Sequence, residues 1–322
     1  MDPSAVATPF IPPDIVLLTA PQLLGVMFNW GLWGILTVQV YLYHLCFNDS
    51  WRIKTLVYGL YVLECLQTAL SSADIFHWFA FGWGRLEILA DPYVNPIDLP
   101  LMAGVIALIV QLYFTWRIWV LGRSAILTVF IAAVSLTQAG AGIAAGIMAM
   151  QIGDLRALQD LVAPKIWLAG AALSDTLIAA AMTYFLVRAR NNSHVPKTNF
   201  ILKRIITLTI ETNSLSASVA IITLALFIKY PGNSLFLCPP YALGKLYSNT
   251  LLVIFNNRMA MPLERSQQHA SIGLSGMGSS GTALNHGGLH NDHHSRREDG
   301  IKITVLRESD RRDEHLRDSP TV

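Results

Sequence analysis

The sequence predicts an all-α polytopic membrane protein, a seven-transmembrane-helix bundle with a disordered C-terminal tail. Three observations lead to this expectation. Of the 322 residues, 53% are hydrophobic and only 14% are charged. The mean hydropathy of +0.45 lies well above the balance of a soluble domain. Seven mostly apolar runs of about 20 residues occur before position 258, and each is long enough to cross a bilayer.

The seven expected spans are joined by short loops and divide the chain into three regions. The spans cover residues 22–46, 55–80, 98–121, 125–150, 166–188, 205–228 and 236–257. A short extracellular N-terminus covers 1–21, the helical domain covers 22–258, and the tail covers 259–322. We expect the tail to be disordered because it mixes Ser, Gly, His and charges of both signs with too few apolar residues to fold alone.

Lys and Arg are distributed unequally between the expected loops. Nine lie in the first, third and fifth loops, and four lie on the other side. The positive-inside rule therefore places the N-terminus outside the cell or in a lumen, and the C-terminus in the cytoplasm. We expect a multi-pass protein of the plasma membrane rather than of an internal membrane.

Several ionisable side chains fall inside the expected spans, where a charge costs roughly 2.5 to 3.5 kcal/mol on insertion scales. Lys245 in the seventh span and Asp175 in the fifth lie at similar depth, roughly 13 Å below the outer end. This agreement makes Asp175 the leading expected ion-pair partner of Lys245. Glu64, near the middle of the second span, is the competing partner. Glu211 is shallower and lies toward the cytoplasmic side, where it could reach water or the amide of Asn213.

These polar groups allow two interpretations. In the first, they satisfy one another inside the bundle. In the second, Glu64, Asp175, Lys245 and Asn249 line a polar cavity that opens to the outside and binds a ligand. Lys245 and Asn249 lie one helical turn apart, so they share a face. A lysine in a seventh helix also allows a retinal Schiff base, although only its position and the helix count support that interpretation.

The fourth span is rich in small residues and contains Gly142 and Gly146 at a spacing that lets helix backbones approach closely. Packing inside the bundle is the first explanation of this pattern. Homodimerisation through the same helix is the second.

We expect no enzymatic activity, no cofactor and no metal site within the spans. The sequence contains no HExxH, GxSxG or P-loop pattern. A net charge of +2, spread over the loops, offers no surface for nucleic acid. The expected partners are the lipid bilayer and a cytosolic protein that contacts residues 188–204 and the tail.

Three stretches carry a resemblance to a known family. They are Gln39–Tyr43, Asp49–Lys54 and Lys245–Leu252, the last continuing to Asn257 and Arg258. Together they resemble an uncharacterised family of seven-pass membrane proteins of mushroom-forming fungi, known only as a domain of unknown function. The resemblance covers roughly residues 20–258 and implies a seven-helix bundle. It implies no substrate, cofactor or catalytic residue.

The function that best fits these features is a receptor-like or sensory protein with an outward-facing polar cavity. A short N-terminus, a basic fifth loop and a long tail favour it. A transporter, or a conduit for protons or solutes that uses intramembrane carboxylates, is the first alternative. A structural membrane organiser is the second.

Overall fold

The computed structural model describes residues 13, 15–153, 161–191, 196–230 and 234–259. Over these residues the chain is helical and contains no β-strand. The expected disordered tail over 259–322 lies outside the described residues except at its first position. Of the segment 188–204, expected to contact a cytosolic partner, the side chains of 192–204 also lie outside them.

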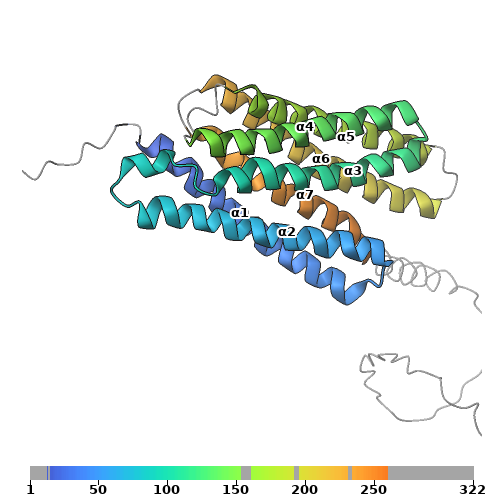
Figure 1. Ribbon diagram of the computed structural model, residues 1–322. Helices are drawn as coiled ribbons and strands as arrows, with labels where there is room; N and C mark the ends of the chain where they lie inside the picture. The colour runs from blue at the N-terminus through green and yellow to red at the C-terminus, as the bar shows by residue number, and fades with distance from the viewer. Residues whose placement is uncertain (1–12, 14, 154–160, 192–195, 231–233, 260–322) are drawn as a thin grey trace, which may run out of the picture. The chain divides into compact units, whose positions relative to one another are not determined.

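The described chain forms seven α-helices joined by short connections (Figure 1). They are α1 (Ile15–Cys46), α2 (Trp51–Ile75), α3 (Ala103–Gly122), α4 (Ala125–Ile152), α5 (Val162–Asn191), α6 (Pro196–Lys229) and α7 (Cys238–Asn256). Two π-helical segments flank the α2–α3 connection: η1 (Phe76–Phe81) continues α2, and η3 (Ile97–Met102) leads into α3. Short 3₁₀ segments are η2 (Leu86–Ala90), η5 (Leu235–Leu237) and η6 (Asn257–Met259).

Each expected span coincides with a helix, and the largest differences are at two helix starts. α1 begins at Ile15 rather than 22, and α6 begins at Pro196 rather than 205. Proline is favourable at the first position of a helix because its missing N–H would have no partner there. Pro196 can therefore begin α6 nine residues before the apolar stretch that the sequence marked from 205.

Within the described residues, four helical segments are long and apolar enough to cross a membrane: Ile15–Cys46, Ile97–Gly122, Ala125–Ile152 and Val162–Ala189. A shorter apolar stretch covers Asn213–Lys229 in α6. The remaining helices, α2 and α7, contain the charged residues Glu64, Asp74 and Lys245, which lower their apolar character. The structure thus supports a helical membrane protein, and the exact count of seven crossings stays a prediction.

The helix α7 occupies a central position among the described helices. It packs against α1, α2, α3 and α6, and Figure 1 shows it running between the α1–α2 pair and the other helices. Twelve of its 19 residues are buried, among them Lys245, Ser248 and Asn249. The polar side chains of α7 therefore depend on neighbouring helices for their hydrogen bonds.

The small residues of α4 pack inside the chain. A Cβ atom added at Gly142 would lie 2.8 Å from the carbonyl oxygen of Pro100, and one at Gly146 would lie 2.7 Å from that of Pro96. Both contacts are shorter than real Cβ atoms tolerate, so η3 packs directly on this face of α4. The structure favours the first explanation of the glycine spacing, packing within the bundle.

We predict that Gly146→Ala destabilises the protein by about 1–3 kcal/mol, because the new methyl group must displace the η3 backbone. The matched control is Gly140→Ala on the same helix, where an added Cβ meets nothing within 4 Å. That variant should be neutral or more stable by up to about 1 kcal/mol, since alanine favours helix more than glycine. Thermal unfolding of the purified proteins in detergent measures both. Equal effects at the two positions would contradict the packing.

Candidate functional site

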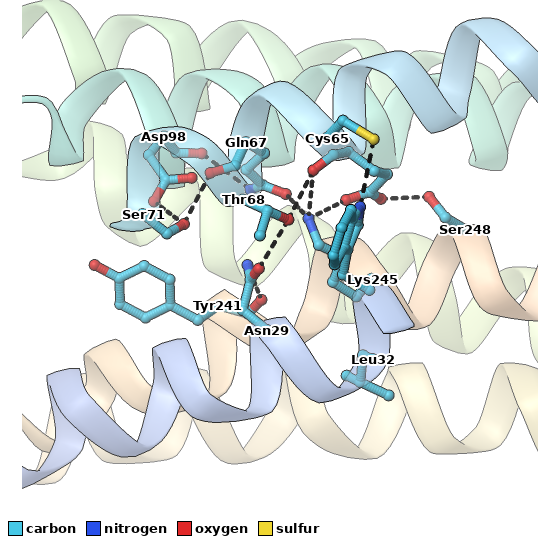
Figure 2. Close-up of polar contacts among 12 residues, drawn as sticks. Asn29, Leu32, Cys65, Gln67, Thr68, Ser71, Asp98, Tyr241, Lys245 and Ser248 are labelled. Carbon is cyan, nitrogen blue, oxygen red and sulfur yellow. Dashed lines mark hydrogen bonds and ion pairs between the residues drawn. The ribbon is translucent and has the colours of Figure 1, made fainter. Parts of the chain in front are cut away.

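Lys245 lies in the middle of α7, and its side chain is completely buried. Its ammonium group forms an ion pair with the carboxylate of Glu64 on α2. It also donates to the carbonyl oxygen of Glu64 at 3.1 Å and to Oε1 of Gln67 at 3.0 Å. Figure 2 shows these contacts converging on the lysine nitrogen. An ammonium group has three protons, so the three acceptors satisfy it.

The carboxylate of Glu64 is held equally well. One oxygen accepts from Lys245, and the other accepts from the hydroxyl group of Ser248, one turn further along α7. Gln67, one turn from Glu64 on α2, donates to the backbone carbonyl of Asp98 in η3 at 3.1 Å. A buried ion pair is tolerated only when its remaining hydrogen-bonding positions are filled, and this pair meets that condition.

Asp175, the leading expected partner of Lys245, lies in a separate polar cluster. Its carboxylate accepts from the hydroxyl group of Tyr247 at 2.5 Å and from Nε2 of Gln111 at 3.0 Å. The expected Asp175–Lys245 pair was therefore wrong, and the competing partner, Glu64, is the observed one. Depth alone could not decide, because Lys245 and Tyr247 are about 200° apart around the axis of α7. Lys245 faces α2, whereas Tyr247 faces α3 and α5.

The two other candidate residues also differ in their surroundings. The amide of Asn249 donates to the carbonyl groups of Leu32, at 3.1 Å, and Lys245, at 2.8 Å, and Gln39 donates to its oxygen. Asn249 thus joins α7 to α1. Glu211 is exposed on α6. The expected contact between Glu211 and the Asn213 amide is wrong, since that buried nitrogen has no hydrogen-bond partner.

A chain of hydrogen bonds continues from Glu64 toward the α2–α3 connection. Thr68 contacts the side-chain oxygen of Asn29 at 3.2 Å, and Asn29 donates to the carbonyl oxygen of Tyr241 at 3.1 Å. The hydroxyl group of Tyr241 accepts from the amide of Asn95 at 2.7 Å. Tyr241 lies one turn before Lys245, so this chain and the ion pair use the same stretch of α7.

At the other end of α7, Arg258 forms an ion pair with Asp49 in the α1–α2 loop. The two Arg258 end nitrogens donate to the two Asp49 oxygens at 3.0 and 2.5 Å, a bidentate arrangement. The guanidinium group also lies over the Phe47 ring, 4.5 Å from its centre. The hydrogen bonds from Arg258 hold the pKa of the Asp49 carboxyl below its usual value. This contact fixes the end of α7 to the α1–α2 loop.

Several members of this network were not singled out by the sequence analysis. Gln67 lies three residues after Glu64 and therefore on the same helical face, a spacing that could have identified it. Tyr247 and Gln111 gave no signal, because a tyrosine and a glutamine in apolar spans carry no charge. Asp98 falls at the start of an expected span and was counted only among the loop charges.

Comparison with known proteins adds one match. A family model described as "Family of unknown function (DUF6534)" matches residues 171–260, which include most of α5 and all of α6 and α7. The matched segment contains Asp175, Lys245 and Arg258, whereas Glu64 and Asp49 lie before it. No curated protein and no solved structure matches the chain. The match indicates an uncharacterised domain; the fungal origin and seven-pass nature implied by the resemblance stay expectations.

We predict that Lys245→Met destabilises the protein by about 3–5 kcal/mol, because it leaves the buried Glu64 carboxylate without a cation. Adding Glu64→Gln should recover part of this loss, with a coupling free energy of about 1 kcal/mol or more. Denaturant unfolding in detergent, followed by circular dichroism, measures the four proteins of the cycle.

The matched control replaces Glu64→Gln with Asp175→Asn in the same cycle. Since Asp175 does not contact Lys245, its effect should add to that of Lys245→Met within about 0.5 kcal/mol. Additivity in the Glu64 cycle, or strong coupling in the Asp175 cycle, would contradict the observed pairing.

We also predict a pH dependence from the Asp49–Arg258 pair. The pKa of Asp49 is lower in the folded protein than in the unfolded chain, where it is about 3.9. The pair therefore contributes stability above about pH 4, and this contribution disappears as the pH falls through the lowered pKa. The range from about pH 3 to about pH 7 includes the neutral and the charged form of Asp49. Over this range, thermal unfolding should show a smaller loss of stability at acid pH in Asp49→Asn than in wild type. Parallel curves would show that the pair contributes nothing.

Proposed function

We propose that the chain is a receptor-like, seven-pass membrane protein that binds a small apolar ligand near the α2–α3 connection. The observation that supports this proposal best is a small apolar cavity of about 40 Å³ between η3 and helices α4 to α7. Its wall includes Asn95, Ala149, Trp167, Phe227, Phe236 and Pro240. Aromatic and aliphatic side chains dominate the wall, as is usual for small-molecule sites.

This cavity differs from the polar one that the sequence suggested. None of Glu64, Asp175, Lys245 and Asn249 lines it. Those side chains instead bind one another or their neighbours in closely packed clusters. The ligand we infer is therefore largely apolar, with at most one polar group, which could reach the side chain of Asn95. A retinal Schiff base on Lys245 has no support, because the three protons of its nitrogen are already bound to Glu64 and Gln67.

The polar network offers a physical route from the pocket to the opposite end of the bundle. Asn95 lines the pocket and binds the Tyr241 hydroxyl group, and Pro240 lines the pocket from the start of α7. From there α7 runs past Lys245 to Arg258, whose partner Asp49 lies in the α1–α2 loop. A ligand that binds one of two positions of α7 more tightly than the other would shift the helix toward that position. A shift at the start of α7 would then change the contact of Arg258 with Asp49 at the other end. In the proposed topology this end, with the tail, faces the cytoplasm.

We predict that a photoreactive apolar probe, decanol bearing a diazirine group, labels Trp167 or Phe236 in the protein reconstituted in nanodiscs. In Ala149→Phe, labelling at these residues should fall about tenfold, the factor given by about 1.4 kcal/mol, because the larger ring fills the pocket. Peptide mass spectrometry measures the labelling. The matched control is Ala133→Phe, which places the same ring on an exposed position of α4.

Two outcomes would contradict the proposal. Labelling that is equal in Ala149→Phe and Ala133→Phe would mean that the probe reaches these residues from lipid rather than from the pocket. Buried carboxylates are the feature that favours a conduit. If reconstituted wild type passes protons or solutes and Glu64→Gln does not, the result would support the conduit instead.

A further inference from the structure

Two buried carboxylates near the α2–α3 connection have unfilled hydrogen-bonding positions. Asp74, near the end of α2, and Asp98, in η3, are both completely buried. Oδ1 of Asp74 accepts from the backbone N–H of Val94 at 3.1 Å, and Oδ2 of Asp98 accepts from the hydroxyl group of Ser71 at 2.5 Å. The second oxygen of each, Oδ2 of Asp74 and Oδ1 of Asp98, has no hydrogen-bond partner among the described residues.

The two carboxylates belong to one place in the fold. Ser71 and Asp74 lie one turn apart on α2, where Ser71 contacts Asp98 and Asp74 contacts Val94. Val94 and Asp98 are also one turn apart, since the N–H of Asp98 donates to the carbonyl of Val94 at 3.1 Å. The Ser71–Asp98 and Asp74–Val94 hydrogen bonds therefore hold both carboxylates beside the same turn of α2. Figure 2 shows the Asp98–Ser71 contact at one end of the polar network, with Ser248 at the other.

No cation of the described chain contacts either carboxylate. Lys245 acts on Asp98 through its charge, but its three protons are used by Glu64 and Gln67. His77, one turn beyond Asp74, forms its ion pair with Asp91 at 2.8 Å. Burying a carboxylate without a countercharge is very unfavourable. Asp74 and Asp98 therefore require either protons or a cation from solution.

We propose that Asp74 and Asp98 bind a hard cation between them through Oδ2 of Asp74 and Oδ1 of Asp98. Carboxylate and other oxygen atoms are the ligands that such cations prefer. The hydroxyl group of Ser71 contacts Asp98 and lies one turn from Asp74. The described residues contain no cluster of three or more His, Cys, Asp or Glu, so Asp74 and Asp98 would be the two charged ligands of the ion. Two negative charges are balanced by one divalent ion, so Ca²⁺ fits better than Na⁺.

The site lies near residues that reach the surface. Asp91, which pairs with His77 one turn beyond Asp74, has a side chain that is 47% exposed. The exposed Asp91 and the buried Asp74 therefore belong to the same end of α2 and the α2–α3 connection. No residue of the proposed cation site lines the apolar pocket, so this proposal does not depend on the proposed receptor function.

The test is equilibrium dialysis of the purified full-length chain in nanodiscs against ⁴⁵Ca²⁺, with a second series against ²²Na⁺. Wild type should bind one ion per chain. Asp98→Asn and Asp74→Asn should each weaken binding by about tenfold or more, since each removes a charged ligand. The matched control is Glu87→Gln, which removes an exposed carboxylate of the same connection and should bind as wild type does.

Each outcome decides the proposal, and the wild-type result alone can overturn it. Binding of Ca²⁺ or Na⁺ by wild type that is weakened in both aspartate variants but not in Glu87→Gln supports the site and identifies the ion. If wild type binds neither ion, the proposal fails, and the carboxyl groups carry protons instead. If wild type binds but Asp98→Asn and Asp74→Asn, shown to be folded by circular dichroism, bind equally well, the ion lies elsewhere and the proposal also fails. A failure of the apolar pocket would leave these results unchanged.

Discussion

The buried ion pair between Lys245 and Glu64 constrains the arrangement of α7 more than any other contact. Neither charge reaches water, so each requires the other, and Ser248 and Gln67 fill the positions that remain. Such a pair adds little net stability over a well-packed apolar one, but breaking it costs several kcal/mol. Rotating α7 about its axis, or sliding it by one turn, would separate the charges. We therefore interpret the pair as fixing the rotation and register of α7 against α2.

That fixed register determines what the rest of α7 contacts. With Lys245 directed at α2, Tyr247 faces Asp175 and Asn249 faces α1. Tyr241 is placed beside Asn95 at one end, and Arg258 meets Asp49 at the other. The same helix thus contacts the wall of an apolar cavity and the α1–α2 loop. A receptor of the proposed kind needs such an element, because a ligand acts at a distance only through a structure with two discrete arrangements.

Hydropathy predicted the helices well and their partners less well. The seven helical segments follow from the apolar runs, and the close packing of Gly142 and Gly146 follows from their spacing. Within the described residues, four segments are long and apolar enough for a span. The charged residues of α2 and α7 lower the apolar character of those helices, and in α6 only Asn213–Lys229 is apolar. The partner of Lys245 could not be chosen between Asp175 and Glu64, because depth along a helix says nothing about direction around it. The apolar cavity left no trace in the sequence, as its wall comes from four helices and η3.

The segment η3 combines roles that are usually separate. Asp98 lies between Pro96 and Pro100, whose carbonyl groups press on the glycines of α4, and the same two prolines line the cavity. A π-helical turn is wider than an α-helical one and often occurs at functional sites. A substitution at Pro100 would act on the contact with α4 and on the cavity wall at once, two residues from the Asp98 carboxylate. Genetic variation in η3 would therefore be pleiotropic, and its effects could not be assigned to one role without changes on the facing helices.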